Sequence, residues 1–193
     1  MIMRGSRGLV LGLAAALGMG ALFVESVAAE EITSAVCVVR PTKENKCRGN
    51  VTFITTKDGT VKVNATIRNL NPNKKHAIHI HQFGDTRDLA GKSAGGHYNP
   101  ENKPHGLPPN AERHAGDLGN LEANDEGIAK YSVIVDNISI SGENGILGRA
   151  IVVHADPDDG GQPTGNAGAR VGYGVIGVRN AEWKWMPVKK STK

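Results

Sequence analysis

The amino-acid sequence predicts an all-β domain, a sandwich or barrel of eight strands with two long functional loops. Short runs of alternating apolar and polar residues recur along the chain, and no long stretch shows a helical period. Turn residues separate these runs. Alternation at every second position is typical of a half-buried strand, and a series of such strands forms a sandwich or barrel.

The run over 60–67, TVKVNATI, shows the pattern best, because its apolar residues all fall on one face and its polar residues on the other. That arrangement predicts a strand with one face in the core. Comparable runs predict strands over 35–40, 51–56, 76–82, 118–122, 128–135, 150–154 and 171–178.

Turn chemistry supports this order of strands. Asp58-Gly59 lies between two predicted strands and is a tight hairpin signal, and 125–127 and 141–145 punctuate later strands. Two longer stretches, 84–116 and 155–170, are rich in glycine, proline, asparagine and charge. Loops of that length in a compact domain are usually functional or disordered.

The ends of the chain divide it into three parts: 1–29, 30–180 and 181–193. Two arginines precede an apolar run over 9–24, and small residues precede Glu30, as in a secretory signal peptide. The alternative is an uncleaved membrane anchor, although the run is short for a span. We expect a mature domain over 30–180, exported to the periplasm or the extracellular space, with no stable membrane span after cleavage.

Charge and the tail say less about partners. The net charge of +4 is modest, and it favours small anions over nucleic acid, which usually needs a strongly basic surface. The tail over 181–193 places Trp183 and Trp185 near several lysines. Packed indoles followed by a solvated end, or attachment to an anionic surface, would both fit this composition.

Cys37 and Cys47 are the two cysteines of the chain, and a polar turn separates them. Export would permit a disulfide between them. A bridge also needs Cα atoms within about 7 Å of each other, which a sequence does not show. A Cys37–Cys47 disulfide and two independent buried thiols therefore both remain open.

Histidine is distributed unusually. His79 and His81 are two residues apart in a predicted strand, so their side chains point to the same face. His97, His105 and His114 lie in the first long loop, followed by Asp117, and His154 ends a strand. Any one of them could be an ordinary surface or core histidine. Because a solvated loop has no packing reason to collect imidazoles, the set as a whole indicates metal binding.

The ligand types separate into two sites. Three histidines and an aspartate fill a tetrahedral shell, which is typical of structural zinc. Four histidines that include the rigid strand pair suit copper, a redox metal that accepts imidazole nitrogen.

Five segments resemble the copper/zinc superoxide dismutase family: HAIHIHQFGD, SAGGHYNP, ERHAGDLGN, GRAIVVHADPDD and TGNAGARVGYGVIG. The similarity extends over nearly all of 34–178. It implies an eight-stranded antiparallel Greek-key sandwich or barrel, copper and zinc as cofactors, superoxide as substrate and a homodimer. The copper ligands that it implies are His79, His81, His97 and His154. The zinc ligands that it implies are His97, His105, His114 and Asp117.

The resemblance also implies roles for single residues. His97 would bridge both metals and supply a proton, and Asp158 would link a copper histidine to a zinc histidine. Arg170 would attract superoxide beside the copper, since its charge is permanent. Without the resemblance, the alternative interpretation is that Asp158 is an ordinary loop aspartate and that Arg170 is a solvated loop arginine.

The sequence departs from the family pattern in two places. The family carries a cysteine near Gly91 and another at the position of Tyr173, and both are absent here. The second loop, over 158–164, also lacks the charged stretch of many relatives. Two alternatives to an enzyme remain: a non-catalytic copper/zinc-binding protein and a structural β-sandwich stabilised by zinc alone.

Overall fold

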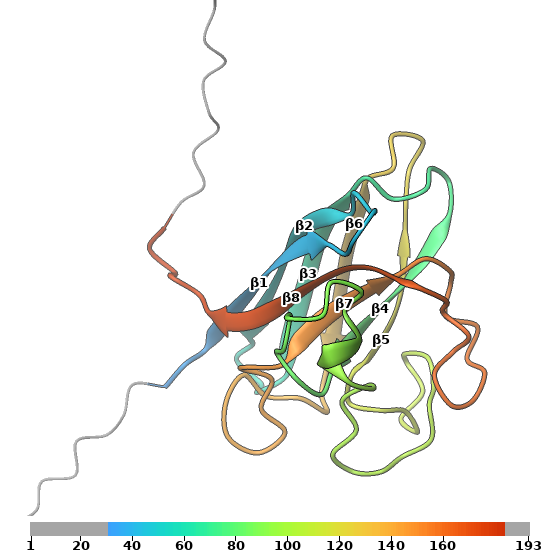
Figure 1. The fold of residues 1–193 in the computed structure, drawn as a ribbon. Coiled ribbons are helices and arrows are strands. Elements are labelled where there is room, and N and C mark those ends of the chain that lie inside the picture. The colour runs from blue at the N-terminus through green and yellow to red at the C-terminus, as the bar shows by residue number, and fades with distance from the viewer. Residues whose placement is uncertain (1–30, 184–193) are drawn as a thin grey trace, which may run out of the picture. The chain divides into compact units, whose positions relative to one another are not determined.

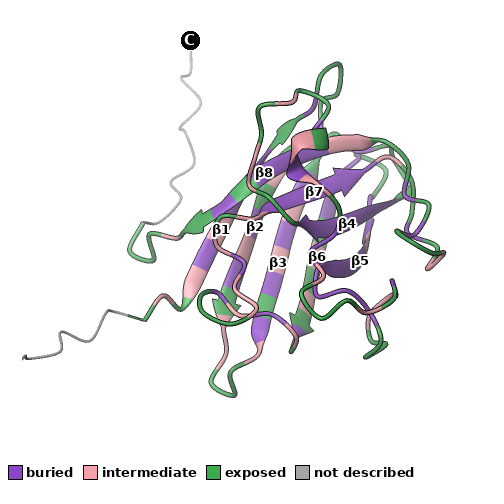
Figure 2. Cartoon of the chain, turned by 60° about the horizontal axis from the view of Figure 1, so that its bottom comes forward, coloured by how far each residue is buried: buried purple, intermediate pink, exposed green. Residues whose placement is uncertain are grey.

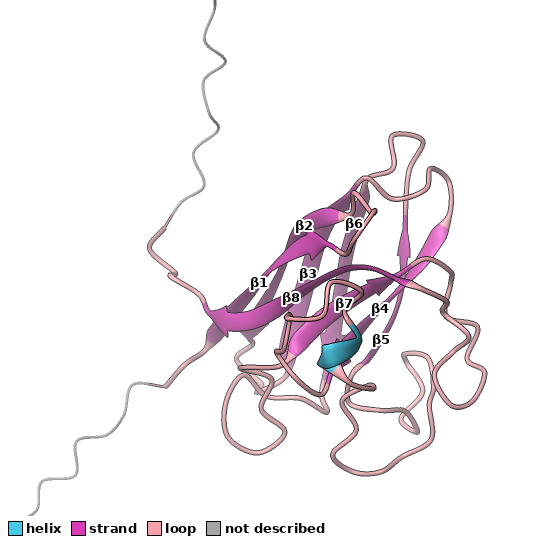
Figure 3. Ribbon diagram, viewed as in Figure 1, coloured by secondary structure: helices cyan, strands magenta, loops and turns pink. Residues whose placement is uncertain are grey.

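The computed structural model describes residues 31–183, which form eight strands and one short 3-10 helix, η1 (Lys92–Ala94). Figure 3 shows that strands and loops make up nearly all of this part of the chain. The strands are β1 (Ser34–Pro41), β2 (Arg48–Thr55), β3 (Val61–Arg68), β4 (Lys75–His81), β5 (Asp117–Glu122), β6 (Ala129–Val135), β7 (Ala150–His154) and β8 (Arg170–Val178). All eight predicted strands are present, with ends shifted by up to three residues.

The strands form one antiparallel sheet in the order β5-β4-β7-β8-β1-β2-β3-β6 (Figure 1). β3 is followed along the chain by β4 in the other half of the sheet, and β6 by β7, which gives the predicted Greek-key crossings. The Tyr131 hydroxyl of β6 donates to the Leu118 carbonyl of β5, so the two edge strands meet. The sheet is therefore a nearly closed barrel.

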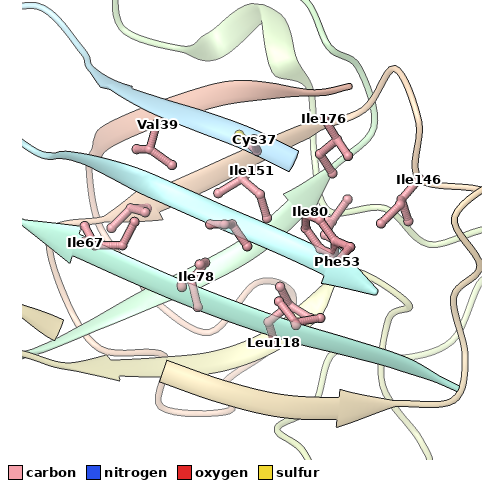
Figure 4. Packing of buried hydrophobic residues seen from close by; sticks show 14 of the residues in the cluster. Cys37, Val39, Phe53, Ile67, Ile78, Ile80, Leu118, Ile146, Ile151 and Ile176 are labelled. Carbon is pink, nitrogen blue, oxygen red and sulfur yellow. The ribbon is translucent and has the colours of Figure 1, made fainter. Parts of the chain in front are cut away.

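The barrel interior is filled by the inward residues of every strand. In β3 the apolar residues over 61–67 are buried, as their alternation predicts. Figure 4 shows Phe53, Ile78, Ile80, Leu118 and Ile151 packed together between the strands. Each such side chain contributes about 1.5–3 kcal/mol when it leaves water.

β4, β5 and β7 depart from simple alternation, because they are buried on both faces. Six of the seven residues of β4 are buried, and so is all of β7. Figure 2 shows both strands almost entirely in the colour of buried residues, with loops running over them. Ile78 and Ile80 belong to the core, so His79 and His81 project from the opposite face, beneath the loops.

Two glycines of β8 allow close packing against β1 and against the turn between β1 and β2. A Cβ at Gly174 would lie 2.3 Å from the carbonyl oxygen of Val38, and one at Gly172 would lie 2.7 Å from Sγ of Cys47. The first two glycines of the G-x-G-x-x-G sequence over 172–177 are thus close-packed barrel backbone, and no helix follows the sequence in the described residues.

Cys37 and Cys47 are both free and buried, so the structure does not contain the disulfide that was one of the two expectations. Cys37 pairs with Val51 across the β1–β2 ladder, and Cys47 lies four residues before Val51 in the chain. Four residues of extended chain span about 13 Å, well beyond the reach of a disulfide. Burial raises the pKa of each thiol to about 12.

The predicted signal peptide, 1–29, and the tail beyond Trp183 lie outside the described residues. Trp183 itself is exposed. Within residues 31–183, no helix has the length and apolar character needed to cross a bilayer.

Candidate metal centre

The six singled-out histidines and Asp117 gather on the outer face of β4, β5 and β7, under the long loops. All seven side chains belong to buried residues. Their ligand atoms form two groups of four, each with its atoms within 4.8 Å of one another, and His97 belongs to both. The first group is His79, His81, His97 and His154, and the second is His97, His105, His114 and Asp117.

Each non-shared histidine of the first group has one nitrogen in use and one without a partner. Nε2 of His79 lies 2.8 Å from Asp158 Oδ2, Nδ1 of His81 lies 2.9 Å from the Gly95 carbonyl, and Nδ1 of His154 lies 3.3 Å from the Gly168 carbonyl. The opposite nitrogens are buried and have no hydrogen-bond partner. Because acceptors hold the ring protons on the outer side, the inner nitrogens present lone pairs to a cation.

The second group has the dimensions of a tetrahedral shell. Nδ1 of His97 lies 2.9 Å from Asp117 Oδ1, and Nδ1 of His114 lies 3.3 Å from Nδ1 of His97 and 3.2 Å from Asp117 Oδ1. Nδ1 of His105 lies 2.9 Å from Asp117 Oδ2. Zinc–nitrogen bonds of about 2.0–2.1 Å imply tetrahedron edges of about 3.3 Å. The group therefore fits zinc with only a small adjustment.

His97 lies between the two groups. Its Nδ1 faces Asp117 and His114, and its ring centroid is 3.9 Å from that of His79. The Nε2 atom, on the far side of the ring, is then the nitrogen available to the first group. An imidazole can bind two cations in this way once both nitrogens are deprotonated.

Asp158 orients one ring in each group. Its Oδ2 accepts from His79 Nε2 at 2.8 Å and its Oδ1 from His105 Nε2 at 2.9 Å. Asn120 holds the aspartate in place, because its side chain accepts from the Asp158 backbone N–H at 2.7 Å and donates to the Asp158 carbonyl at 2.9 Å. One carboxylate thus couples the geometry of both groups.

Burial and charge set the protonation of these ligands. Burial lowers the pKa of His79 to about 4 and that of His154 to about 3, so both rings are neutral near pH 7. For His105, burial is outweighed by Asp117 and Asp158, which raise its pKa to about 9. Burial alone would raise the pKa of the Asp117 and Asp158 carboxyls. Hydrogen bonds from histidines outweigh it and hold both pKa values well below the usual range. A metal in the second group therefore replaces a proton on His105.

We expect the metal-free protein to be most stable near pH 6.5. As pH falls below 6.5, the unfolded chain protonates at His79 and His154, while the folded chain does not until about pH 4 and 3, so stability is lost. As pH rises from 6.5 to about 9, the folded chain keeps a proton on His105 that the unfolded chain has released, and stability is lost again.

Urea midpoints of the metal-free protein across this pH range test the expectation. His105→Asn is the control, because it should remove the loss on the alkaline side and leave the acid side unchanged. A midpoint that keeps rising up to pH 9 in the unmodified protein would contradict the assigned protonation of His105.

Several supporting groups are not apparent in the sequence. The carbonyls of Gly95 and Gly168 hold ligand rings, and backbone groups carry no sequence signal. Gly165 has φ +76°, and a Cβ there would lie 2.1 Å from Asp158 Oδ1 and 2.8 Å from His105 Nε2. His76, excluded from the predicted ligands, donates from Nδ1 to the His154 carbonyl at 2.9 Å. Of these supporting groups, only Gly165 has a signal in the sequence, because it lies in a glycine-rich segment after His154.

A pocket of about 330 Å³ opens onto three of the four ligands of the first group, and it reaches the second group only at the shared His97. Its lining residues are His81, Gly96, His97, His154, Thr164, Asn166, Ala167, Gly168 and Arg170. The guanidinium of Arg170 is partly buried and donates to the carbonyls of Gly91 and Gly95 at 2.5 and 2.6 Å. A small anion that enters this pocket meets a fixed positive charge beside the three histidines.

Comparison with known proteins agrees with this geometry. The family model described as copper/zinc superoxide dismutase (SODC) matches residues 47–176. The chain is 46% identical over 145 residues to "Superoxide dismutase [Cu-Zn] 3" of Arabidopsis thaliana, and the aligned region covers 72% of this chain and 87% of that protein. It is 44% identical over 155 residues to "Superoxide dismutase [Cu-Zn] 2" of Mesembryanthemum crystallinum, with 77% and 97% covered.

A solved structure, "Crystal Structure Analysis of the clock protein EA4", superposes on this fold with a TM-score of 0.71 at 38% identity. The match covers 79% of this chain and 99% of the other. Sequence and fold thus agree along the same barrel that carries the two ligand groups. The chain belongs to the copper/zinc superoxide dismutase family, whose members of that name are oxidoreductases.

Proposed function

We propose that the protein dismutes superoxide at a copper ion held by His79, His81, His97 and His154. A zinc ion held by His97, His105, His114 and Asp117 lies next to it. The observation that carries this assignment is the pair of four-ligand groups that share one imidazole. Three ligands of the first group border the pocket that also contains Arg170, whereas the second group reaches it only through the shared His97, so we assign the redox metal to the first group.

The copper, when bound, supplies a one-electron couple through which one superoxide is oxidised to oxygen and another is reduced to hydrogen peroxide. The protein contributes the surroundings of that couple. Arg170 attracts the anion into the pocket and orients it. Each hydrogen peroxide formed consumes two protons. His97 would supply one from Nε2, after that nitrogen has taken a proton from solvent while it is not holding copper, and solvent would supply the other. Nδ1 of His97 would stay on the zinc side.

The second group supports a structural role for zinc. Its four ligands all come from the protein and complete a tetrahedron, which leaves no open position for a substrate. Zinc also has no redox chemistry of its own. Bound by these ligands, it would link the first long loop to Asp117 of β5 and would hold the shared His97 imidazole in place.

Superoxide dismutation by the purified protein, with copper and zinc content determined on the same sample, tests the proposal. We expect activity at about one copper and one zinc per chain. Full occupancy of both groups without activity would reject the enzyme and leave the non-catalytic metal-binding alternative. One zinc without copper binding would favour the zinc-stabilised sandwich.

Arg170→Gln is expected to lower kcat/KM for superoxide about tenfold, because the fixed charge at the pocket no longer attracts the anion. The dependence of the rate on ionic strength should weaken as well. Pulse radiolysis at several salt concentrations measures both effects. Arg87→Gln is the matched control, since Arg87 is an exposed arginine of the first long loop that pairs with Asp85 and does not line the pocket. An equal loss in both variants would argue against a local role for Arg170.

The proposal includes a homodimer and export. Val38, Phe83 and Val175 are apolar and exposed. Val38 and Val175 border one shallow hollow, and Val175 approaches Gly84, the residue after Phe83. Exposed apolar side chains on this side of the barrel support pairing with a second copy. Val175→Glu should convert a dimer to a monomer in analytical ultracentrifugation. Composition at the N-terminus supports export.

A further inference from the structure

We propose that Tyr173 is a positioning residue for Arg170, and that it fixes the loop over 84–96 without a covalent bond. This segment, called the anchor loop below, supplies the carbonyls that hold the guanidinium. The inference rests on the proposed function, because it concerns the group that guides the anion to the copper. It assigns to Tyr173 a task that no ligand residue performs.

Tyr173 projects from β8 to the side away from the main core. It is buried and forms a separate apolar cluster with Ala94, Ala150 and Val152. Ala94 belongs to η1 of the anchor loop, which lies beside β7 and β8 in Figure 1. The ring therefore joins the loop to two strands of the barrel.

Two further contacts tie Tyr173 to other parts of the anchor loop. Its hydroxyl donates to the Thr86 carbonyl at 3.3 Å. A Cβ at Gly91 would lie 3.7 Å from Cγ of the Tyr173 ring, so the ring lies directly against that backbone. One side chain thus touches the loop near its start, at its tip and in η1.

The anchor loop is braced internally, so a shift at one point moves the rest. The Ser93 hydroxyl donates to the Asp85 carbonyl at 2.7 Å and accepts from the Asp88 N–H at 3.2 Å. The Asp88 carboxylate accepts from the N–H groups of Ala90 and Lys92 at 3.2 and 2.5 Å. These bonds close the loop on itself and make it a single unit.

Arg170 depends on this unit for its orientation. Its two donations end on Gly91 and Gly95, and the Gly95 carbonyl also accepts from Nδ1 of His81. Thr42 holds only the Arg170 backbone, through a bond from its hydroxyl to the Arg170 carbonyl at 2.8 Å. If the ring of Tyr173 is removed, the loop loses the contacts that the ring makes at Thr86, Gly91 and Ala94. The Gly91 and Gly95 carbonyls that hold the guanidinium then lose that support.

No disulfide takes part in this anchoring within residues 31–183, where both cysteines are free and lie on or next to β1 and β2. Backbone bonds add further links. The Lys43 N–H donates to the Leu89 carbonyl at 2.8 Å, and the N–H groups of Gln82 and Phe83, just after β4, donate to the carbonyls of Gly96 and Ala94, each at 3.0 Å. The position of Arg170 is therefore set by packing and hydrogen bonds, which thiol reductants do not affect.

Azide, a small anion, is a probe for the pocket once the protein carries copper and zinc. An optical titration of the copper(II) spectrum measures its Kd without any turnover. We expect Tyr173→Ala to weaken azide binding about tenfold, because Arg170 is no longer oriented, and Tyr173→Phe to stay within about threefold, because the ring remains. Unchanged affinity in Tyr173→Ala would overturn the proposal.

Two comparisons separate positioning from general destabilisation. Ile176→Ala, on the same strand but in the main core, should lower the urea midpoint and leave azide binding unchanged. In an Arg170→Gln background, Tyr173→Ala should change the azide Kd less than twofold, since the residue acts through Arg170. Equal tenfold losses in both backgrounds would overturn that route.

Hydrogen exchange of the metal-free protein tests the anchor independently of copper and of activity. Peptides over 84–96 should exchange faster in Tyr173→Ala, and a thiol reductant should not change their exchange in the unmodified protein. Faster exchange of this loop on reduction would overturn the non-covalent anchor. Failure of the unmodified protein to bind copper would instead reject the proposed function and leave this result interpretable.

Discussion

His154→Ala is expected to reduce superoxide dismutation by more than about 100-fold while the protein keeps about one zinc per chain. His154 belongs to the first ligand group only, and its Nε2 is buried with no partner in the protein. Alanine removes one of the four proposed copper ligands. No neighbouring imidazole can take the place of the missing ligand, because outer acceptors already hold the other rings. The second group lies intact on the far side of His97.

Metal content by mass spectrometry and pulse radiolysis on one sample measure this prediction. His114→Ala is the reciprocal control, since His114 belongs to the second group only. It should lose zinc and retain copper. If both variants lost both metals equally, the two groups would not be separable sites and the assignment of a metal to each would be wrong.

Asp158→Asn is expected to weaken both metals at once, each by about 10- to 100-fold. The two carboxylate oxygens accept from the outer nitrogens of His79 and His105 at 2.8 and 2.9 Å. An amide of the same shape replaces one acceptor by a donor, so one ring must turn or change its tautomer. The remaining acceptor is neutral, which weakens the bond to the other ring as well.

Competition with a chelator of known affinity measures the two dissociation constants. Asp159→Asn is the matched control, because Asp159 follows directly in the chain and is exposed, and its carboxylate accepts only from Asn166 and from the Gly161 N–H, neither of them a ligand. It should leave both constants within about twofold. Loss of zinc alone in Asp158→Asn would show that the carboxylate supports only His105.

Period-two alternation carries most of the information about the barrel. It predicts β3 almost to the residue, because a strand with one face in the core and one in water must alternate. In β4 the buried residues do not alternate with exposed ones, because loops cover the outer face of the strand. There the sequence shows its structure only through chemistry, in two histidines placed on one side and two isoleucines on the other.

The cysteines show where local spacing fails. A polar turn between Cys37 and Cys47 is compatible with a bridge across a hairpin, yet the register pairs Cys37 with Val51 and separates the thiols. Register depends on how all the strands fit together, and a one- or two-residue change in the turn alters it. Spacing along the chain therefore does not decide such a pair.

The sequence by itself determined the eight strands, because alternation is a property of the residues in order. A concentration of imidazoles indicated metal binding, and the resemblance of five segments predicted the family and the candidate ligand residues, which the structure brings together in two groups. Tertiary structure alone decided which nitrogens face inward, how Asp158 joins His79 to His105, and how Tyr173 supports Arg170 across the anchor loop. Those contacts join residues far apart in the chain and include backbone carbonyls. Their partners are set by the path of two long loops over the barrel, and no local pattern encodes that path.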